Sequence, residues 1–160
     1  LLAKEVMTGE RLLNELWLEA MKKRGSAELV LSGTSMQPVI PKGSRIRIDT
    51  ALDAEAGHVA CFLRNGRFFA HRVLLTTQYP GGRLYVEGPE MYRNPAIFTR
   101  GDLLGRVTAF RFPDNESEPW HTVEARDIGI RELISALLCL AGFPFLAGSR
   151  ILLNKVHKRA

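Results

Sequence analysis

The chain has 160 residues, of which 46% are hydrophobic, and its 22 Lys and Arg outnumber its 17 Asp and Glu to give a net charge of +5. This length can bury one good core, so we expect one domain with appended segments. Residues 150–160 carry four basic and no acidic residues, which leaves a net charge of only +1 for the rest of the chain. A face that reads nucleic acid would spread Lys and Arg over the folded domain, so no nucleic-acid partner is expected.

The first segment, residues 1–26, is predicted to be an N-terminal amphipathic helix that runs from about Glu10 to Arg24. Thr8 or Gly9 can cap its start, and Gly25 can end it. Its apolar residues fall on one stripe: Leu12, Leu13, Leu16, Trp17, Ala20 and Met21. Such a stripe either packs on a core or contacts a lipid or a leader peptide, and the sequence leaves both readings open.

Residues 27–125 alternate short apolar runs with turn signals. Strands are predicted at residues 45–48, 59–63, 67–75, 84–87 and 103–112, and Asn65-Gly66 predicts a hairpin between the second and third of these. The predicted fold class is therefore mainly β, a small coiled antiparallel barrel or sandwich between the N-terminal helix and a C-terminal apolar helical segment.

A serine lies on a Gly-flanked corner between two apolar runs, in the segment LSGTSMQPVIPKGS of residues 31–44. Gly33 permits backbone conformations that other residues avoid, and Pro38 and Pro41 prevent a helix from forming downstream. Ser35 is thus held by the backbone and is either an ordinary loop serine or a nucleophile.

The run Ser35-Met36-Gln37-Pro38, followed by Gly43 and a strand, resembles the serine motif of the type I signal peptidase family and of its relatives, the self-cleaving SOS-response repressors. The resemblance covers about residues 28–109 and implies that Ser35 is a nucleophile whose own backbone N–H helps to bind the oxyanion. Some family members carry a hydroxyl two positions before the nucleophile, where this chain has Gly33.

A serine nucleophile needs a base within hydrogen-bond reach. Most bacterial members of the family use a lysine on a later strand, and His71 stands at that position in the segment FFAHRVL of residues 68–74. This His-Arg-Val sequence is similar to the endoplasmic-reticulum and archaeal signal peptidases. Imidazole titrates near neutral pH without burial, so His71 is the predicted base. The rival is His58, at the start of the hairpin.

An acid would orient the histidine ring and stabilise its charged form. The candidates are Asp102, Glu90 and Glu87, and the resemblance favours Asp102 because Gly101-Asp102 matches the family's Gly-Asp pair. In a second register that pair falls at Gly88-Pro89, and Asp102 is again the acid that precedes the closing strand. Its other reading is a turn residue that opens a strand.

Metal and cofactor signals are missing from the sequence. The four histidines are scattered, no phosphate-binding Gly-rich loop is present, and Cys61 and Cys139 form neither a disulfide framework nor a Cys-x-x-Cys pair. We therefore expect no metal and no cofactor.

The last segment, residues 126–160, is predicted to be an apolar, basic-ended tail that associates with the membrane. Residues 133–149 carry no charge, and the basic cluster follows. The apolar stretch 133–153 is near the lower length limit for a spanning helix, so a span, an interfacial hairpin and a buried core helix all remain open. The basic end favours an anionic membrane surface on either side of the bilayer.

These features together predict a membrane-associated serine endopeptidase that cleaves a peptide or preprotein, such as a signal or leader sequence, through a Ser35–His71 pair and an acyl-enzyme. Two alternatives remain. One is a catalytically inert module of the same fold that binds peptides or a membrane, and the other is a regulator that cleaves itself.

Overall fold

The computed structural model describes residues 9–142 except 65, 91–93, 114 and 116, and in its first helix the side chains of residues 9–15 and 17 lie outside that description. The elements are α1 (Gly9–Arg24), β1 (Ser26–Val30), β2 (Arg45–Asp49), β3 (Val59–Arg64), β4 (Arg67–Tyr79), β5 (Gly82–Gly88), β6 (Ala96–Thr99), β7 (Leu103–Arg111) and β8 (His121–Thr122). Residues 130–142 are also helical.

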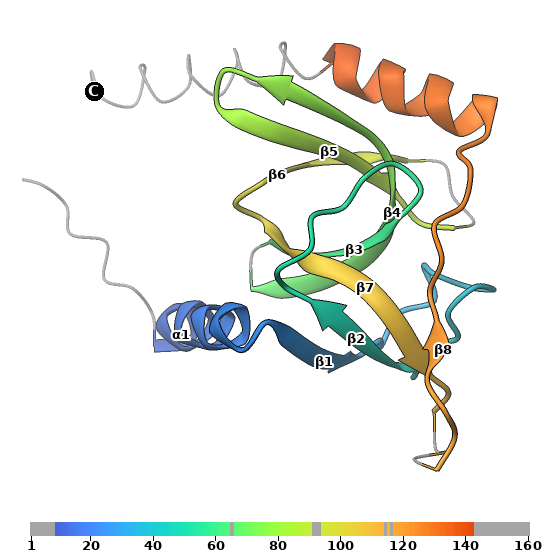
Figure 1. The fold of residues 1–160 in the computed structure, drawn as a ribbon. Helices are drawn as coiled ribbons and strands as arrows, with labels where there is room; N and C mark the ends of the chain where they lie inside the picture. The colour runs from blue at the N-terminus through green and yellow to red at the C-terminus, as the bar shows by residue number, and fades with distance from the viewer. Residues whose placement is uncertain (1–8, 65, 91–93, 114, 116, 143–160) are drawn as a thin grey trace, which may run out of the picture.

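The strands form one curled antiparallel sheet in the order β1-β2-β7-β3-β4-β5-β6, with β8 paired to β7 (Figure 1). The prediction of a mainly β, antiparallel domain is therefore confirmed. The expected amphipathic stripe on α1 stays a prediction, because the side chains of Leu12, Leu13 and Trp17 are outside the described set. Most of the apolar segment 133–153 and all of the basic tail also lie outside the described residues.

The hairpin predicted at Asn65-Gly66 is present. Arg64 pairs with Arg67 at its closed end, and Gly66 has a φ of 72°, which is the left-handed conformation that such turns require. On β4 the side chains alternate between two cores: Ala70 packs in the cluster that contains Cys61, and Phe69 packs against the cluster that contains Phe62. Residues 67, 69 and 71 therefore share one face of β4, and residues 68 and 70 share the other.

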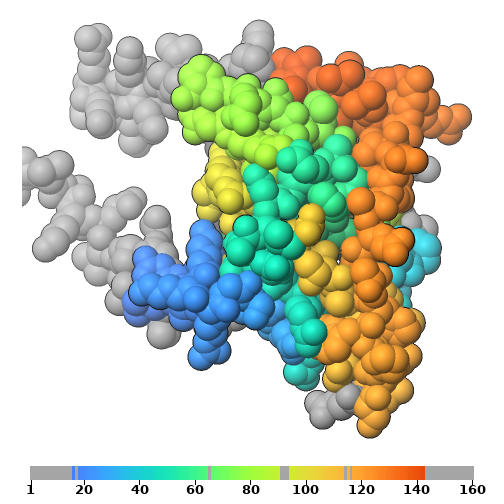
Figure 2. All heavy atoms as spheres, viewed as in Figure 1, coloured from blue at the N-terminus to red at the C-terminus, as the bar shows by residue number. Residues whose placement is uncertain are grey.

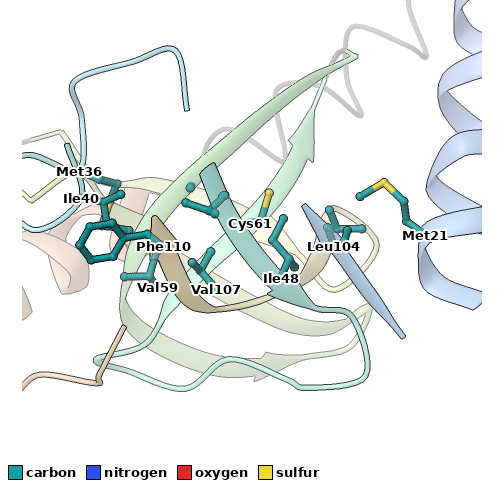
Figure 3. Packing of buried hydrophobic residues seen from close by; sticks show 12 residues of the cluster. Met21, Met36, Ile40, Ile48, Val59, Cys61, Leu104, Val107 and Phe110 are labelled. Atoms are coloured by element: carbon teal, nitrogen blue, oxygen red, sulfur yellow. The ribbon is translucent and has the colours of Figure 1, made fainter. Parts of the chain in front are cut away.

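The larger core lies inside the curl of the sheet and is closed by the loop after β1 (Figure 3). Met36 and Ile40 of that loop are 2% and 1% exposed and pack beside Phe110 of β7. Met21 of α1 reaches the same cluster at its other end. The loop that carries Ser35 is therefore anchored by buried side chains on either side of a short turn.

The chain after β8 crosses the sheet and leads into the helical residues 130–142, which lie along the surface beside the β4–β5 hairpin (Figures 1 and 2). The backbone N–H of Arg126 donates to the carbonyl of Gly57 at 3.1 Å, and Ala136 is fully buried against Leu74 and Val86. Among the described helices, none is long and apolar enough to cross a membrane.

Candidate active site

Ser35 lies in a turn that short backbone hydrogen bonds close. The N–H of Leu31 donates to the carbonyl of Ser44 at 2.9 Å, and the N–H of Gly43 donates to the carbonyl of Leu31 at 2.7 Å, so the loop leaves and rejoins the sheet at one point. The carbonyl of Ser35 accepts the N–H of Glu90 at 2.8 Å. These bonds fix the backbone at Ser35.

His71 lies on β4 with its side chain only 15% exposed, and its Nδ1 contacts Oε2 of Glu87, whose side chain is 4% exposed. Both atoms are buried, and within the described part of the chain neither has another hydrogen-bond partner. A carboxylate at Nδ1 favours the tautomer that carries its proton there. The other nitrogen, Nε2, is then free to accept a proton.

Ser35 and His71 line the same groove, which has a volume of about 650 Å³. One wall consists of residues 29–33 together with Ser35, the other consists of residues 67–71 of β4, and Ile46 and Cys61 form the floor. The structure thus brings the predicted nucleophile and the predicted base to one cavity from positions far apart in the sequence.

The two walls of the groove are edges of β1 and β4 along which no further strand pairs among the described strands. β1 pairs with β2 on one side only, and β4 pairs with β3 over residues 67–72 but with β5 only from Arg72 onward. Within the described residues, no strand occupies the space between these edges. Backbone N–H and C=O groups at such edges are a template for an added extended chain.

Asp102 lies away from His71. Its Oδ2 accepts the backbone N–H of Thr99 at 2.8 Å and the Thr99 hydroxyl at 2.9 Å, and Arg64 approaches the same oxygen at 3.8 Å. Asp102 therefore closes the turn between β6 and β7, which is the turn reading of this residue. The expectation that Asp102 orients the histidine is corrected: the carboxylate at the ring is Glu87.

Glu90, the remaining acidic candidate, belongs to a separate buried charge network. Arg72 is 2% exposed and makes an ion pair with Glu90, and the second carboxylate oxygen of Glu90 accepts from Arg126 at 3.2 Å. Arg126 in turn pairs with Glu132 in the first turn of the helical residues 130–142. Glu90 is thus neutralised by two guanidinium groups while its backbone holds Ser35.

His58 is engaged outside the groove. Its Nδ1 accepts the backbone N–H of Glu55 at 3.0 Å, and its Nε2 lies 3.4 Å from Arg106. Burial and the neighbouring guanidinium of Arg106 lower the pKa of His58 below its usual value. With both nitrogens in contact with other groups, His58 is not placed to serve Ser35.

The groove holds few other ionisable groups. Burial raises the pKa of the Cys61 thiol to about 12, so Cys61 stays a neutral thiol in the floor. Among the described residues, no group of three or more His, Cys, Asp or Glu side chains is placed to hold a metal ion. The polar side chains that line the groove are those of Ser32, Ser35, Arg67 and His71, and Glu87 lies behind the His71 ring.

The backbone N–H of Ser35 and position 33 both lie close to the Ser35 hydroxyl. Within the described part of the chain, no acceptor receives the N–H of Ser35. A Cβ atom built at Gly33 would have the Ser35 Oγ as its nearest neighbour, at 4.0 Å. Position 33 thus borders the hydroxyl and has space for a small side chain.

Sequence reasoning named Glu87 as an alternative but could not choose it, because a β-bulge decides which face it occupies. The β4–β5 register starts at Tyr79 opposite Gly82 and shifts between Val73 and Leu75. An unbroken register would place Glu87 opposite Leu74, on the face away from His71. The shift instead places Glu87 opposite Val73, on the face of His71.

A scan of the sequence against protein-family models gives no match, and a search of curated proteins gives none either.

Proposed function

We propose that this protein is a serine endopeptidase of the signal-peptidase type, in which Ser35 is the nucleophile, His71 the general base and Glu87 the acid that orients the base. The observation that carries the proposal is the shared groove: Ser35 and a histidine backed by a buried carboxylate line one cavity between two unpaired strand edges.

In the proposed reaction, Nε2 of His71 removes the proton from the Ser35 hydroxyl while Oγ attacks the carbonyl carbon of a peptide bond. The N–H of Ser35 donates to the oxygen of the tetrahedral intermediate. His71 then passes the proton to the departing amine and activates a water molecule, which hydrolyses the ester on Ser35 and regenerates the hydroxyl. Glu87 stabilises the imidazolium in both halves without itself taking up the proton.

The proposed substrate is an extended peptide that adds a strand between the edges of β1 and β4. Side chains on one face of that strand would meet the apolar floor formed by Ile46, Cys61 and Ala70. Leader and signal peptides of preproteins, with small residues near the cut, are the substrates that the family resemblance suggests. The chemistry needs no cofactor.

We also propose that the protein works at a membrane surface. The helical residues 130–142 expose a row of large apolar side chains: Ile130 is 75% exposed, Leu138 69%, Ile134 51% and Leu137 50%. The sequence after them stays uncharged to residue 149 and then carries four basic residues. Apolar side chains beside a basic segment fit a bilayer with anionic headgroups.

Sedimentation with vesicles tests the membrane proposal. Wild-type protein should sediment with anionic vesicles more than with neutral ones, and the double variant I134S/L138S should sediment less with both. Equal sedimentation of the variant and the wild type would contradict a role for this helix face.

A leader-peptide library tests the catalytic proposal. Wild-type protein, Ser35→Ala and His71→Ala are incubated with the library, and products are identified by mass spectrometry. We expect products from the wild type alone. Equal product from all three proteins would leave an inert binding module, and cleavage of the chain itself would indicate a self-cleaving regulator.

A further inference from the structure

The walls and floor of the groove carry one permanent charge. Most of the lining is apolar, and Arg67 contributes the only guanidinium among the described lining residues. Arg67 is exposed at the end of β4 where the hairpin begins. It thus stands at the far end of the groove wall from His71.

Arg67 and His71 lie on the same face of β4. Neighbouring side chains alternate along a strand, so residues 67, 69 and 71 share a face, and the rings of Phe69 and His71 are 6.1 Å apart. Four residues of extended chain span about 13 Å. A substrate strand lying along β4 with its scissile carbonyl at His71 would therefore bring a residue about four positions away to Arg67.

The charge of Arg67 is not compensated within the described part of the chain, where no carboxylate pairs with it. The neighbouring hairpin residue Arg64 differs: its guanidinium lies 3.9 Å from the centre of the Phe98 ring and makes an ion-pair contact with Asp102. His71 differs as well, because Glu87 is at its ring. A carboxylate on a bound peptide would supply the opposite charge that Arg67 lacks.

We propose that Arg67 is a specificity-determining residue that selects peptides with an aspartate or glutamate about four residues from the scissile bond. This inference rests on the proposed function, because it needs a peptide bound along the groove. The guanidinium is always protonated and can donate two parallel hydrogen bonds to one carboxylate, so glutamate should be favoured over glutamine as well as over lysine.

The experiment compares peptides that differ at one position. Twelve-residue peptides built on a library hit carry Glu, Gln or Lys at each position in turn on both sides of the bond. Cleavage is measured with wild-type protein, Arg67→Glu and Arg131→Glu. Arg131 is exposed and lies outside the groove, and its substitution changes the net charge by the same amount as Arg67→Glu. Binding of the same peptides to the Ser35→Ala protein is measured by fluorescence polarisation.

With wild-type protein, kcat/KM for Glu at about the fourth position should exceed that for Lys by roughly three- to tenfold, as for an exposed or half-buried ion pair. Arg67→Glu should reverse this order, Arg131→Glu should keep it, and 0.5 M salt should weaken it. Cleavage with equal rates for Glu and Lys would overturn the inference and leave the proposed function intact.

The binding measurement tests the inference even if the wild-type protein cleaves no peptide. A Glu preference in binding to the Ser35→Ala protein that Arg67→Glu reverses would support the inference even if the wild type yields no product. Binding of no peptide, or binding without a charge preference, would overturn it.

Discussion

Two carboxylates on this sheet, the half-buried Asp53 and the buried Glu87, differ in the number of groups that they contact. At the far end of β5, Asp53 accepts the hydroxyl of Tyr85 at 2.7 Å, Arg100 at 2.7 Å, Arg83 at 2.9 Å and its neighbouring Ala54 N–H at 2.8 Å. At the groove, Glu87 directs Oε2 at one partner, His71. Asp53 therefore accepts four hydrogen bonds, whereas the Glu87 carboxylate contacts the ring of His71.

The difference separates a structural cluster from the proposed catalytic one. Four donors to Asp53 stabilise its charge and connect the loop before β3 to β5 and to the turn after β6, which is a folding role. The contact between the buried Glu87 carboxylate and the His71 ring contributes little to stability, because burial opposes the charge of both groups. Such arrangements are typical of sites where a proton must move.

The largest expected effect comes from neutralising Glu87. Glu87→Gln keeps the shape of the side chain but removes the charge that orients His71 and stabilises its protonated form, so kcat on a cleaved peptide should fall by about 10²- to 10⁴-fold. The melting temperature should not fall, because no buried charge is left unpaired. Steady-state kinetics and calorimetry measure the two.

Asp102→Asn is the matched control for this change, since Asp102 serves the β6–β7 turn. It should keep wild-type kcat with a slightly lower melting temperature. If Asp102→Asn lost activity and Glu87→Gln kept it, the assignment of the orienting acid to Glu87 would be wrong.

The second effect is a gain at Gly33. A hydroxyl there would border Ser35 Oγ and offer a second donor to the oxyanion, so Gly33→Ser should raise kcat roughly tenfold. Gly33→Ala adds the carbon without the donor and should leave kcat near the wild-type value. An equal rise in both variants would show that the backbone, and not the hydroxyl, is responsible.

The third effect belongs to the structural cluster. Asp53→Asn removes charge-assisted bonds from Arg83, Arg100 and the Tyr85 hydroxyl, so the protein should lose about 1 kcal/mol of stability, or roughly 2–4 °C in melting temperature. Its kcat should stay unchanged. Thermal unfolding and steady-state kinetics of the same variant measure these two effects. A loss of activity without a loss of stability would contradict the purely structural role of Asp53.

The smallest effect is the pH dependence of the stability difference between the wild type and Asp53→Asn. Burial alone would raise the pKa of Asp53, but the bonds from Tyr85 and Ala54 and the charges of Arg100 and Arg83 together hold it below its usual 3.8. The unfolded carboxyl therefore takes up a proton first, and the stabilisation is complete above about pH 4 and lost as the pH falls through the folded pKa. The gap in unfolding free energy between wild type and Asp53→Asn should shrink from pH 6 to below pH 3, and a gap that widened would contradict this.

Sequence patterns predicted the features that depend on interactions between residues close in the sequence. The hairpin at Asn65-Gly66 and the alternation along β4 each follow from a few neighbouring residues. The turn of Ser35 is instead fixed by the distant N–H of Glu90, and Gly33 does not adopt the left-handed conformation that a glycine there would permit. β6 and β8 were not predicted, because four residues and two residues are too short for a clear alternating pattern.

The features that were missed depend on contacts between distant segments. Glu87 reaches His71 only because a bulge shifts the β4–β5 register by one residue. The residues of the β4–β5 turn, at the other end of the hairpin, do not predict this bulge. The approach of Arg126 to Glu90 joins groups 36 positions apart. An acidic residue near a glycine, as at Asp102, has the same local pattern in a turn and in an active site.

The most direct test of the account is the site of acylation. Wild-type protein is mixed with an activated ester of a cleaved peptide, quenched in acid during the first turnover, and digested for mass spectrometry. The account predicts the acyl group on Ser35, in an amount that falls sharply in Glu87→Gln and to zero in Ser35→Ala. Acylation of another residue, or an equal amount of adduct in Ser35→Ala, would contradict it.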